Sequence, residues 1–393
     1  MDSRSNIKWN PFSSGYFENP YPHLEDCRKN NPVQKIFNDS YFFFKYEDIN
    51  TYLKEKDFKV HSLSEYLGEK EAYIFKNTKD ACPYLGNATQ LWPMYLNDGI
   101  HRKIRRAITL AFHSLPLEDL MIESLESTLS IFKNQNSFNL VDFCGKFIYL
   151  FIKKTLNIDN EEYNRIKSFS NLLARSQDLY IPKQIYQEIN SEIISLKSIF
   201  KKSIFKDTVL KETIDLNLNE EHLYSIMLIS FMAAFETSKD NLSLSLYEIL
   251  KKPKLIDYVS KTDKKGFKSF IEETFRFSSP LQYTIRINTY PLNVGGFEIP
   301  KNSKLYLCLA SANRDEKVFK QADELIPDRE HNPHIAFGYG YHQCLGATIA
   351  RQEMEICLKP MIHFLKDYSI VNLKWSKQIF MRTAKTIMVQ KNR

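Results

Sequence analysis

Glycine and cysteine are scarce in this chain of 393 residues, and no hydrophobic run is long enough to span a membrane. The most apolar stretch, residues 223–235, contains Ser225 and Ser230 and is shorter than the ~20 residues that a span needs. The N-terminus lacks the apolar core and cleavage site of a signal peptide. Six scattered cysteines without a C-x-x-C pair are typical of free thiols in a reducing compartment. We therefore expect a cytoplasmic protein that has no membrane contact.

The charge is also small, since 54 Lys and Arg against 47 Asp and Glu give a net charge of +7. A charge this modest and diffuse does not indicate a nucleic-acid partner. The hydrophobic fraction of 43% and charged fraction of 26% are those of a soluble globular protein. No repeat, low-complexity tract or Gly/Ser linker marks a boundary, which favours one domain over residues 1–393.

Hydrophobic periodicity predicts a mainly helical protein with small β-sheets. Apolar residues recur at helical spacing in 101–112, 122–133, 184–205 and 219–252. The last segment begins at a capping Asn219, ends before Pro253 and is apolar on nearly all sides at its centre, so it should run through the interior. Short strand-like segments occur at 40–46, 284–296, 303–310 and 383–390.

Three of the eleven glycines lie in FGYGYHQCLG, residues 337–346, around a single cysteine. A lone cysteine is usually a small buried hydrophobic residue. Here, however, glycines permit a tight backbone, and a helix that begins just after Cys344 favours a thiolate. A nucleophile would need a base, and His342, two residues away, does not guarantee one. A single thiolate cannot complete a zinc site. One axial thiolate on a haem is the arrangement that is left.

The segment NPHIAFGYGYHQCLGATIARQEME resembles, without a gap, the haem-binding signature F-G-x-G-x-H-x-C-x-G of the cytochrome P450 family. The resemblance covers residues 98–351 densely. It implies the single-domain cytochrome P450 fold of the soluble bacterial type, and haem b (iron protoporphyrin IX) with the Cys344 thiolate as its axial metal ligand. Phe337, His342 and Gly346 are then cofactor-binding residues of the same signature.

Glu273 and Arg276 stand three residues apart in EETFRF, which alone indicates an ordinary helix-surface pair worth about 0.3 kcal/mol. The resemblance implies more. In the family this pair joins an arginine that precedes the cysteine loop, and Arg329 of LIPDRE occupies that place. The three residues would form a structural lock on the proximal side of the haem.

The centre of the long helix, AAFET, is similar to the oxygen-activation motif of the family, with Ala234 where glycine is usual. A threonine in a helix often only bonds back to the carbonyl four residues earlier. The resemblance instead implies that Thr237 hydrogen-bonds iron-bound dioxygen, that Glu236 relays protons, and that Ala233 lies against the cofactor.

Residues 98–113 resemble the helix of the family that carries a histidine and an arginine four residues apart. His101 and Arg105 would share a helix face and bind a haem propionate. Arg286 matches the strand arginine that also pairs with the propionates, a role that His342 shares. For Lys103 and Arg106 a solvated cationic face is the competing interpretation.

The resemblance implies a monooxygenase, an oxidoreductase that incorporates one oxygen atom of O2. Because the chain shows no flavin or iron–sulfur domain, electrons would come from a separate ferredoxin or flavodoxin with its reductase. Arg102, Lys103, Arg105 and Arg106 are a candidate docking element for such an acidic carrier. We expect a monomer.

The substrate is expected to be a small hydrophobic organic molecule, fatty-acyl or secondary-metabolite, either free or tethered to a carrier protein. Three alternatives stay open: a peroxide-driven oxidase, a catalytically inactive P450-like protein that recruits partners, and a haem sensor. The Glu236–Thr237 pair argues against all three. By family analogy, the substrate pocket is lined by residues 61–95, 170–200, Met232 to Thr237, Leu281 to Thr284, and Phe380 with Met381. The first of these segments contains the aromatics Tyr66, Tyr73, Phe75, Tyr84, Trp92 and Tyr95. Aromatic residues at such spacing are as often core residues.

Overall fold

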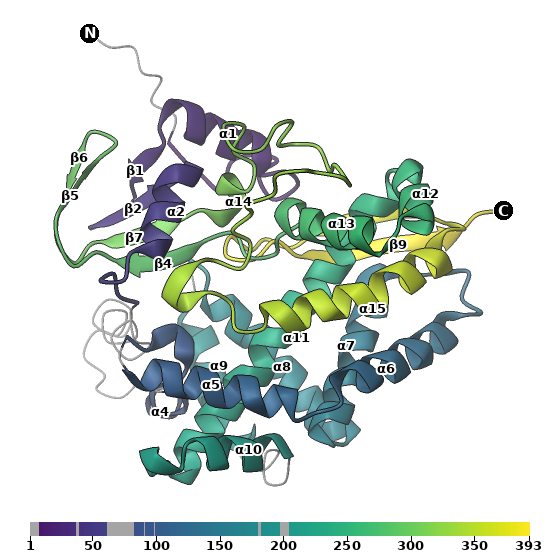
Figure 1. Ribbon diagram of the computed structural model, residues 1–393, viewed down its shortest axis with the longest axis horizontal. Helices are drawn as coiled ribbons and strands as arrows, with labels where there is room; N and C mark the ends of the chain where they lie inside the picture. The colour runs from purple at the N-terminus through teal and green to yellow at the C-terminus, as the bar shows by residue number, and fades with distance from the viewer. Residues whose placement is uncertain are drawn as a thin grey trace. The chain divides into compact units, whose positions relative to one another are not determined.

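The computed structural model describes residues 8–36, 39–60, 82–89, 91–97, 99–179, 182–196 and 204–393. Asp98 and the aromatics Tyr66, Tyr73 and Phe75 of the predicted pocket lie outside these ranges. Helices dominate the described residues and the β-sheets are small, which confirms the predicted fold class (Figure 1).

The chain divides into two compact units. Met1–Lys59, Ser137–Val141 and Asp240–Arg393 form the first, here called the sheet unit. Val60–Asn136 and Asp142–Lys239 form the second, here called the helical unit. The prediction of one domain over 1–393 stays a prediction.

The sheet unit holds the strands and the helices that surround the cysteine loop. Its elements are α1 (Tyr21–Asn30), β1 (Val33–Lys35), β2 (Ser40–Phe43), α2 (Tyr46–Lys54), β3 (Ser137–Asn139), α12 (Pro253–Lys261), α13 (Lys264–Phe277), β4 (Thr284–Ile287), β5 (Leu292–Val294), β6 (Phe297–Ile299), β7 (Lys304–Leu307), α14 (Leu309–Ala312), the 3-10 turn η4 (Gly340–His342), α15 (Ala347–Leu365), β8 (Tyr368–Trp375) and β9 (Ala384–Lys391).

The largest sheet has the strand order β1-β2-β7-β4, with β2 parallel to β7 and the other neighbours antiparallel. All four residues of β2 are buried, so its sequence SYFF is the continuous apolar run of a covered strand. Strands β3, β9 and β8 form a second, antiparallel sheet, and β5 and β6 form a hairpin. The largest sheet fixes Arg286 of β4 opposite Leu305 of β7.

The helical unit contains no strand among its described residues. Its elements are α4 (Pro83–Thr89), the 3-10 turn η2 (Pro93–Tyr95), α5 (Gly99–His113), α6 (Leu117–Phe132), α7 (Leu140–Leu156), α8 (Asn160–Ser176), α9 (Lys183–Leu196), α10 (Ile204–Glu212), the 3-10 turn η3 (Ile214–Leu216) and the first part of α11 (Glu220–Leu250). The rest of α11, from Asp240, belongs to the sheet unit.

Helix α11 begins where the sequence predicts. The side chain of Asn219 accepts a hydrogen bond from the His222 N–H at 3.0 Å, which caps the first turn. Pro253 follows the helix and opens α12, where a missing N–H costs nothing. The apolar residues of α11 are mostly buried, as expected for an internal helix.

Other boundaries differ from the predictions. The helix predicted over 184–205 corresponds to α9, which ends at Leu196, and α10, which begins at Ile204; residues 197–203 lie outside the described ranges. The strand predicted over 303–310 ends at Leu307, because a short helix, α14, follows Cys308. Strand β8 was not predicted, although its sequence YSIVNLKW is largely apolar and aromatic; most of its residues are at least partly exposed.

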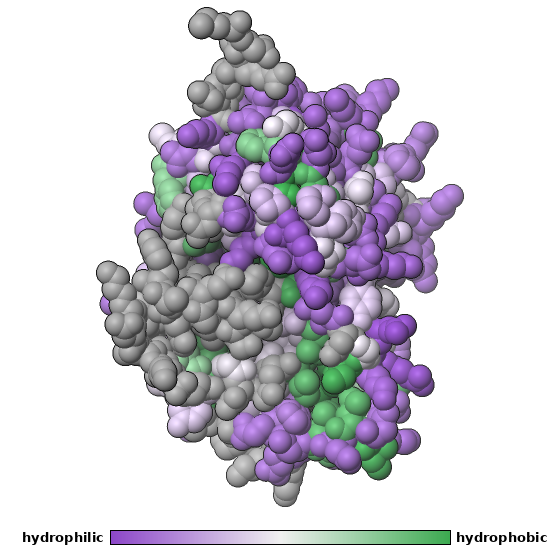
Figure 2. All heavy atoms as spheres, turned by 90° about the vertical axis from the view of Figure 1, so that its left-hand side faces the viewer, coloured by the Kyte–Doolittle hydropathy of each residue, from purple (hydrophilic) through white to green (hydrophobic). Residues whose placement is uncertain are grey.

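None of the described helices is long and apolar enough to cross a membrane. Among the side chains that are coloured by hydropathy in Figure 2, most are hydrophilic, and the largest hydrophobic group lies at the lower right of the view.

Candidate haem-thiolate site

The cysteine loop needs its glycines. Gly338 and Gly340 adopt positive φ angles of 65° and 72°, which side-chain-bearing residues rarely take. A Cβ atom on Gly340 would also lie 2.6 Å from the carbonyl oxygen of Leu53 in α2. The backbone therefore passes closer to α2 than any other residue type would allow.

Cys344 differs from the other five cysteines because its residue is exposed while theirs are buried. Its N–H donates to the carbonyl of Phe337 at 2.8 Å, which closes the loop, and α15 begins three residues later at Ala347. The buried-hydrophobe interpretation is thus wrong for this residue. A thiol that is accessible beside a helix N-terminus is suited to act as a thiolate ligand.

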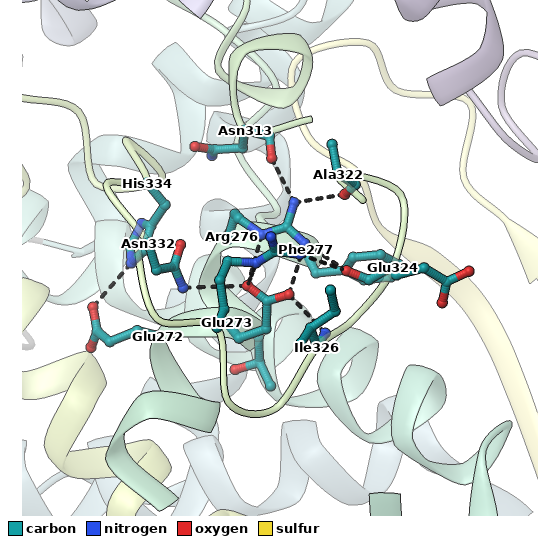
Figure 3. A network of polar contacts seen from close by, with 12 residues as sticks. Glu272, Glu273, Arg276, Phe277, Asn313, Ala322, Glu324, Ile326, Asn332 and His334 are labelled. Carbon is teal, nitrogen blue, oxygen red and sulfur yellow. Dashed lines mark hydrogen bonds and ion pairs between the residues drawn. The ribbon is translucent and has the colours of Figure 1, made fainter. Parts of the chain in front are cut away.

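The structure brings Glu273 and Arg276 together (Figure 3), and Arg329 forms a second ion pair with Glu273. Arg276 donates Nε to Glu273 at 2.7 Å and a terminal nitrogen at 2.8 Å, and Arg329 donates Nε at 2.9 Å. The side chains of Glu273 and Arg276 are fully buried, so the surface-pair interpretation does not hold. Burial alone raises the pKa of Glu273, but the hydrogen bonds and charge of Arg276 and Arg329 outweigh it and keep this pKa below its usual value.

This cluster ties α13 to the irregular segment before the cysteine loop. Arg276 also donates to the backbone carbonyls of Asn313, Ala322 and Glu324. The Ile326 N–H donates to Glu273 at 2.9 Å. These bonds satisfy the buried charges and hold a segment that has no regular secondary structure of its own.

Glu272, which the sequence analysis did not single out, forms a second cluster beside the first. Its carboxylate accepts two hydrogen bonds from Arg351, at 2.7 and 2.8 Å, and lies 3.0 Å from His334 Nε2. Burial raises the pKa of Glu272, but His334 and Arg351 outweigh it and lower this pKa to about 2. The available signal was the doubled glutamate of EETFRF together with an arginine one turn into the helix after Cys344.

The lowered pKa of Glu272 predicts a pH dependence of stability. A carboxyl group with a depressed folded-state pKa contributes stability above its unfolded pKa of about 4.5, and this contribution is lost as the pH falls towards 2. We expect Glu272→Gln to be less stable than wild type at pH 7 and the difference to shrink at pH 3. Urea unfolding at both pH values measures it. An equal difference at both would contradict the assigned pairing.

Arg286 is a buried cation that suits an anionic ligand. Its side chain donates to the carbonyl of Ile285 at 2.9 Å and contacts the Thr284 hydroxyl at 3.4 Å. No carboxylate among the described residues pairs with it, and burial lowers its pKa to about 10. A buried charge without a counter-charge is costly unless a ligand supplies one. The propionates of a haem would do so.

We expect Arg286→Met to have opposite effects on two quantities. The haem-free protein should become as stable or more stable, by about 1–3 kcal/mol, because an uncompensated buried charge is replaced by an apolar side chain of similar length. Haem should bind about tenfold or more weakly, because a propionate loses its partner. Urea unfolding of the haem-free form and a haem titration measure the two effects. Unchanged haem affinity would show that Arg286 does not meet the cofactor.

The other predicted propionate partners lie on regular elements. His342 ends the turn η4 and is partly exposed. In the helical unit, His101 is buried on α5 and Arg105 is half-buried one turn later. Among the four predicted docking cations, Arg102 and Arg106 are exposed, whereas Lys103 forms an ion pair with Asp215.

The centre of α11 has one bare face. Ala233 and Ala234 are exposed within an otherwise buried stretch, and Thr237 is half-buried. The Thr237 hydroxyl donates to the Ala233 carbonyl at 2.6 Å, so the bond back to the preceding turn is present. Glu236 is buried and pairs with Lys239. Small residues without covering side chains leave room for a flat group against the helix.

Two predicted pocket segments lie side by side in the sheet unit. Leu281 and Met381 form an antiparallel bridge, the Gln282 N–H donates to the Phe380 carbonyl at 2.9 Å, and the rings of Tyr283 and Phe380 are 5.3 Å apart. In the helical unit, Trp92 is completely buried, so it is a core residue and not a pocket aromatic.

Within the sheet unit, an exposed thiol on a glycine-shaped loop and a buried arginine without a described carboxylate partner fit a haem. The comparisons with known proteins agree. The family model described as cytochrome P450 matches residues 267–390. The biotin biosynthesis cytochrome P450 of Bacillus subtilis (strain 168) is 25% identical over 381 residues, covering 92% of this chain and 93% of that protein. Cytochrome P450 119 of Sulfurisphaera tokodaii is 28% identical over 370 residues, covering 91% and 95%.

Solved structures show the same fold. The structure of P450BioI in complex with an acyl carrier protein ligated to hexadec-9Z-enoic acid matches with a TM-score of 0.82 and 20% identity, covering 96% of this chain and 100% of that one. Fold and thiol together define a haem-thiolate oxidoreductase. The family model and the curated relatives support a cytochrome P450, a family of monooxygenases whose members bind haem through a cysteine thiolate.

Proposed function

We propose that this chain is a haem-thiolate monooxygenase that hydroxylates, or otherwise oxidises, a hydrophobic organic substrate of the fatty-acyl or secondary-metabolite class. The observation that carries the proposal is the exposed Cys344 on a loop held in place by Gly338, Gly340 and the Glu273 cluster. Cys344 would hold the haem iron through its thiolate, and the haem so held would supply the chemistry that cleaves dioxygen.

The remaining residues bind and orient the cofactor. Arg286, His342, His101 and Arg105 are the proposed partners of the propionates, because cationic donors on rigid elements suit carboxylates. Phe337 and Gly346, which belong to the same loop signature as Cys344, would help to hold the haem. Ala233 lies on the bare face of α11, whose small residues would leave room for the cofactor.

Thr237 and Glu236 are the proposed proton-delivery residues. The Thr237 hydroxyl donates to a helix carbonyl, so its oxygen lone pairs can accept a proton donor such as water. Glu236 forms an ion pair with Lys239, whose side chain is partly accessible, and this contact suits a group that relays protons from solvent.

We expect Thr237→Ala to uncouple electron consumption from product formation. Without the hydroxyl, proton delivery loses its acceptor, and product formed per electron pair should fall about tenfold or more while hydrogen peroxide rises. Thr237→Ser keeps a hydroxyl and should stay close to wild type. Simultaneous assays of product and peroxide measure the split. Equal coupling in Thr237→Ala and wild type would exclude Thr237 from proton delivery.

A separate ferredoxin or flavodoxin with its reductase is the proposed electron source. Arg102 and Arg106 are exposed cations on α5 that suit an acidic carrier. Lys103 contributes less, because Asp215 neutralises it.

The substrate class is supported by the partly exposed aromatic Phe380 of the pocket segments, and by likeness to a P450 whose structure holds an acyl carrier protein with a fatty acyl group. A substrate that is tethered to a carrier protein is therefore included. Both the peroxide-driven oxidase and the inactive recruitment protein are less well supported, because the chain keeps Cys344, Glu236 and Thr237.

The test is isotopic. The protein is given a ferredoxin with its reductase, labelled dioxygen, and fatty acids in free and carrier-bound form. One labelled oxygen atom per product is expected. Oxidation that needs peroxide but no reductase would favour the oxidase. No oxidation of any candidate, with no haem spectral shift on adding them, would favour the recruitment protein.

A further inference from the structure

Two adjacent glutamates of α13 serve different segments of the sheet unit. In Figure 3 the Glu273 carboxylate is directed into the arginine cluster, whereas that of Glu272 is directed towards His334. Glu273 holds the segment that contains Arg329. Glu272 instead contacts one residue on each side of the cysteine loop: His334 before it and Arg351 after it.

Glu272 joins His334 and Arg351, and these three residues are here called the clasp. The Arg351 guanidinium binds both carboxylate oxygens, with Nε at 2.7 Å and a terminal nitrogen at 2.8 Å, the two-point pairing that is strongest and most directional. His334 Nε2 lies 3.0 Å from one of the same oxygens. A single carboxylate thus closes the chain between residues 334 and 351, and Cys344 lies within this closed segment.

Phe337 connects the clasp to the cysteine. The Arg351 guanidinium lies over its ring at 4.7 Å, and the rings of Phe275 and His334 have their centroids 4.7 and 6.0 Å away. The carbonyl of Phe337 accepts the hydrogen bond from the Cys344 N–H at 2.8 Å. Movement of Arg351 or His334 would therefore displace Phe337 and, through its carbonyl, the backbone of Cys344.

Arg351 also lies within electrostatic reach of the thiol. The pKa of Arg351 is raised, first by its hydrogen bond to Glu272 and, among smaller causes, by the charge of Cys344. The main partner of the Arg351 guanidinium is the Glu272 carboxylate. Without Glu272, the guanidinium would be free to turn towards the thiolate and withdraw charge from it.

We propose that Glu272 is a positioning residue for the haem ligand, one that holds both ends of the cysteine loop and keeps Arg351 from competing with iron for the Cys344 thiolate. This inference rests on the proposed role of Cys344. It adds a residue that acts through Arg351, His334 and Phe337, none of which contacts the Glu273 carboxylate in the structure.

The chain offers a matched control for the test. Glu355 of α15 pairs with Lys268 of α13 at 3.2 Å, so it joins the same two helices as Glu272 but does not touch the loop. Glu272→Gln and Glu355→Gln each remove one carboxylate between α13 and α15. The readout is the rate at which the reduced, carbon-monoxide-bound holoprotein loses its thiolate absorption band at a fixed mild temperature, followed together with helix content.

We expect Glu272→Gln to lose the thiolate band about tenfold faster than wild type while its helix content is unchanged, since a two-point charged pair is lost. Its reduction potential should become more positive, because the thiolate gives less charge to iron. Glu355→Gln should behave like wild type, since partly exposed pairs contribute little.

A wild-type rate for Glu272→Gln would overturn the inference, and so would equal acceleration in both variants, which would indicate helix packing alone. If Glu272→Gln does not accumulate, Arg351→Lys keeps the charge but loses the two-point pairing. It should accelerate band loss several-fold, and a wild-type rate there would also overturn the inference. A wild-type protein without any thiolate band would overturn both this inference and the proposed function, whereas a stable band in wild type and variant alike would overturn this inference alone.

Discussion

Replacing Cys344 by serine is expected to abolish substrate oxidation, with a fall in turnover of about a thousandfold or more. A serine hydroxyl at this position is neutral and a weak donor, so the iron would lose the charge donation that drives cleavage of the O–O bond. The loop itself should persist, because Gly338, Gly340 and the Cys344 N–H make its backbone contacts without the sulfur. Turnover with a ferredoxin and its reductase measures the loss.

Cys308→Ala is the matched control. Cys308 is a buried cysteine of the same unit, and burial raises the pKa of its thiol to about 12, so it stays protonated. This variant should lose a little stability through the missing sulfur but keep its turnover per haem. Comparable losses in both variants would mean that turnover reports general damage and not thiolate ligation.

Replacing Glu273 by glutamine is expected to destabilise the fold by about 3–5 kcal/mol, the cost of leaving buried charges without their counter-charge. Arg276 and Arg329 would both lose an anionic acceptor, and the side chain of Arg276 is completely buried. The segment that leads into the cysteine loop would lose its anchor, so haem content should fall as well. Urea unfolding and haem content of the purified variant measure the two effects.

Glu324→Gln provides the comparison for this variant. The backbone carbonyl of Glu324 accepts a bond from Arg276, but its side chain is exposed and pairs with Lys252 on the surface. Removing that surface charge should cost less than about 1 kcal/mol. If both variants unfold at the same urea concentration, the buried cluster does not carry the stability that its geometry implies.

The parts of the site that the sequence predicted are those with a local signal. The spacing of glycines around Cys344 predicted a tight loop before a helix, and the structure has both. Helix α11 was predicted from its periodicity, its capping Asn219 and the proline that follows it. These signals lie within a few residues of what they determine, so one sequence is enough to find them.

The parts that were missed depend on contacts between distant residues. Glu272 meets Arg351 and His334 across 79 and 62 positions of sequence, and the doubled glutamate of EETFRF alone does not indicate those partners. Trp92 was also missed as a core residue, because the neighbouring sequence does not predict its complete burial. Strand β8 exposes much of its length and pairs with β9; its Tyr, Ile, Val and Trp residues favour a strand, but the sequence does not indicate this pairing partner.

The central claim is that Cys344 presents a thiolate to haem iron, and one absorption spectrum tests it most directly. The purified protein, supplemented with haem, is reduced and exposed to carbon monoxide. The account predicts a Soret band at the long-wavelength position that is diagnostic of thiolate-ligated haem, and its loss in Cys344→Ser. A band at the shorter-wavelength position of histidine-type haem, or no haem signal in a fresh preparation, would contradict it.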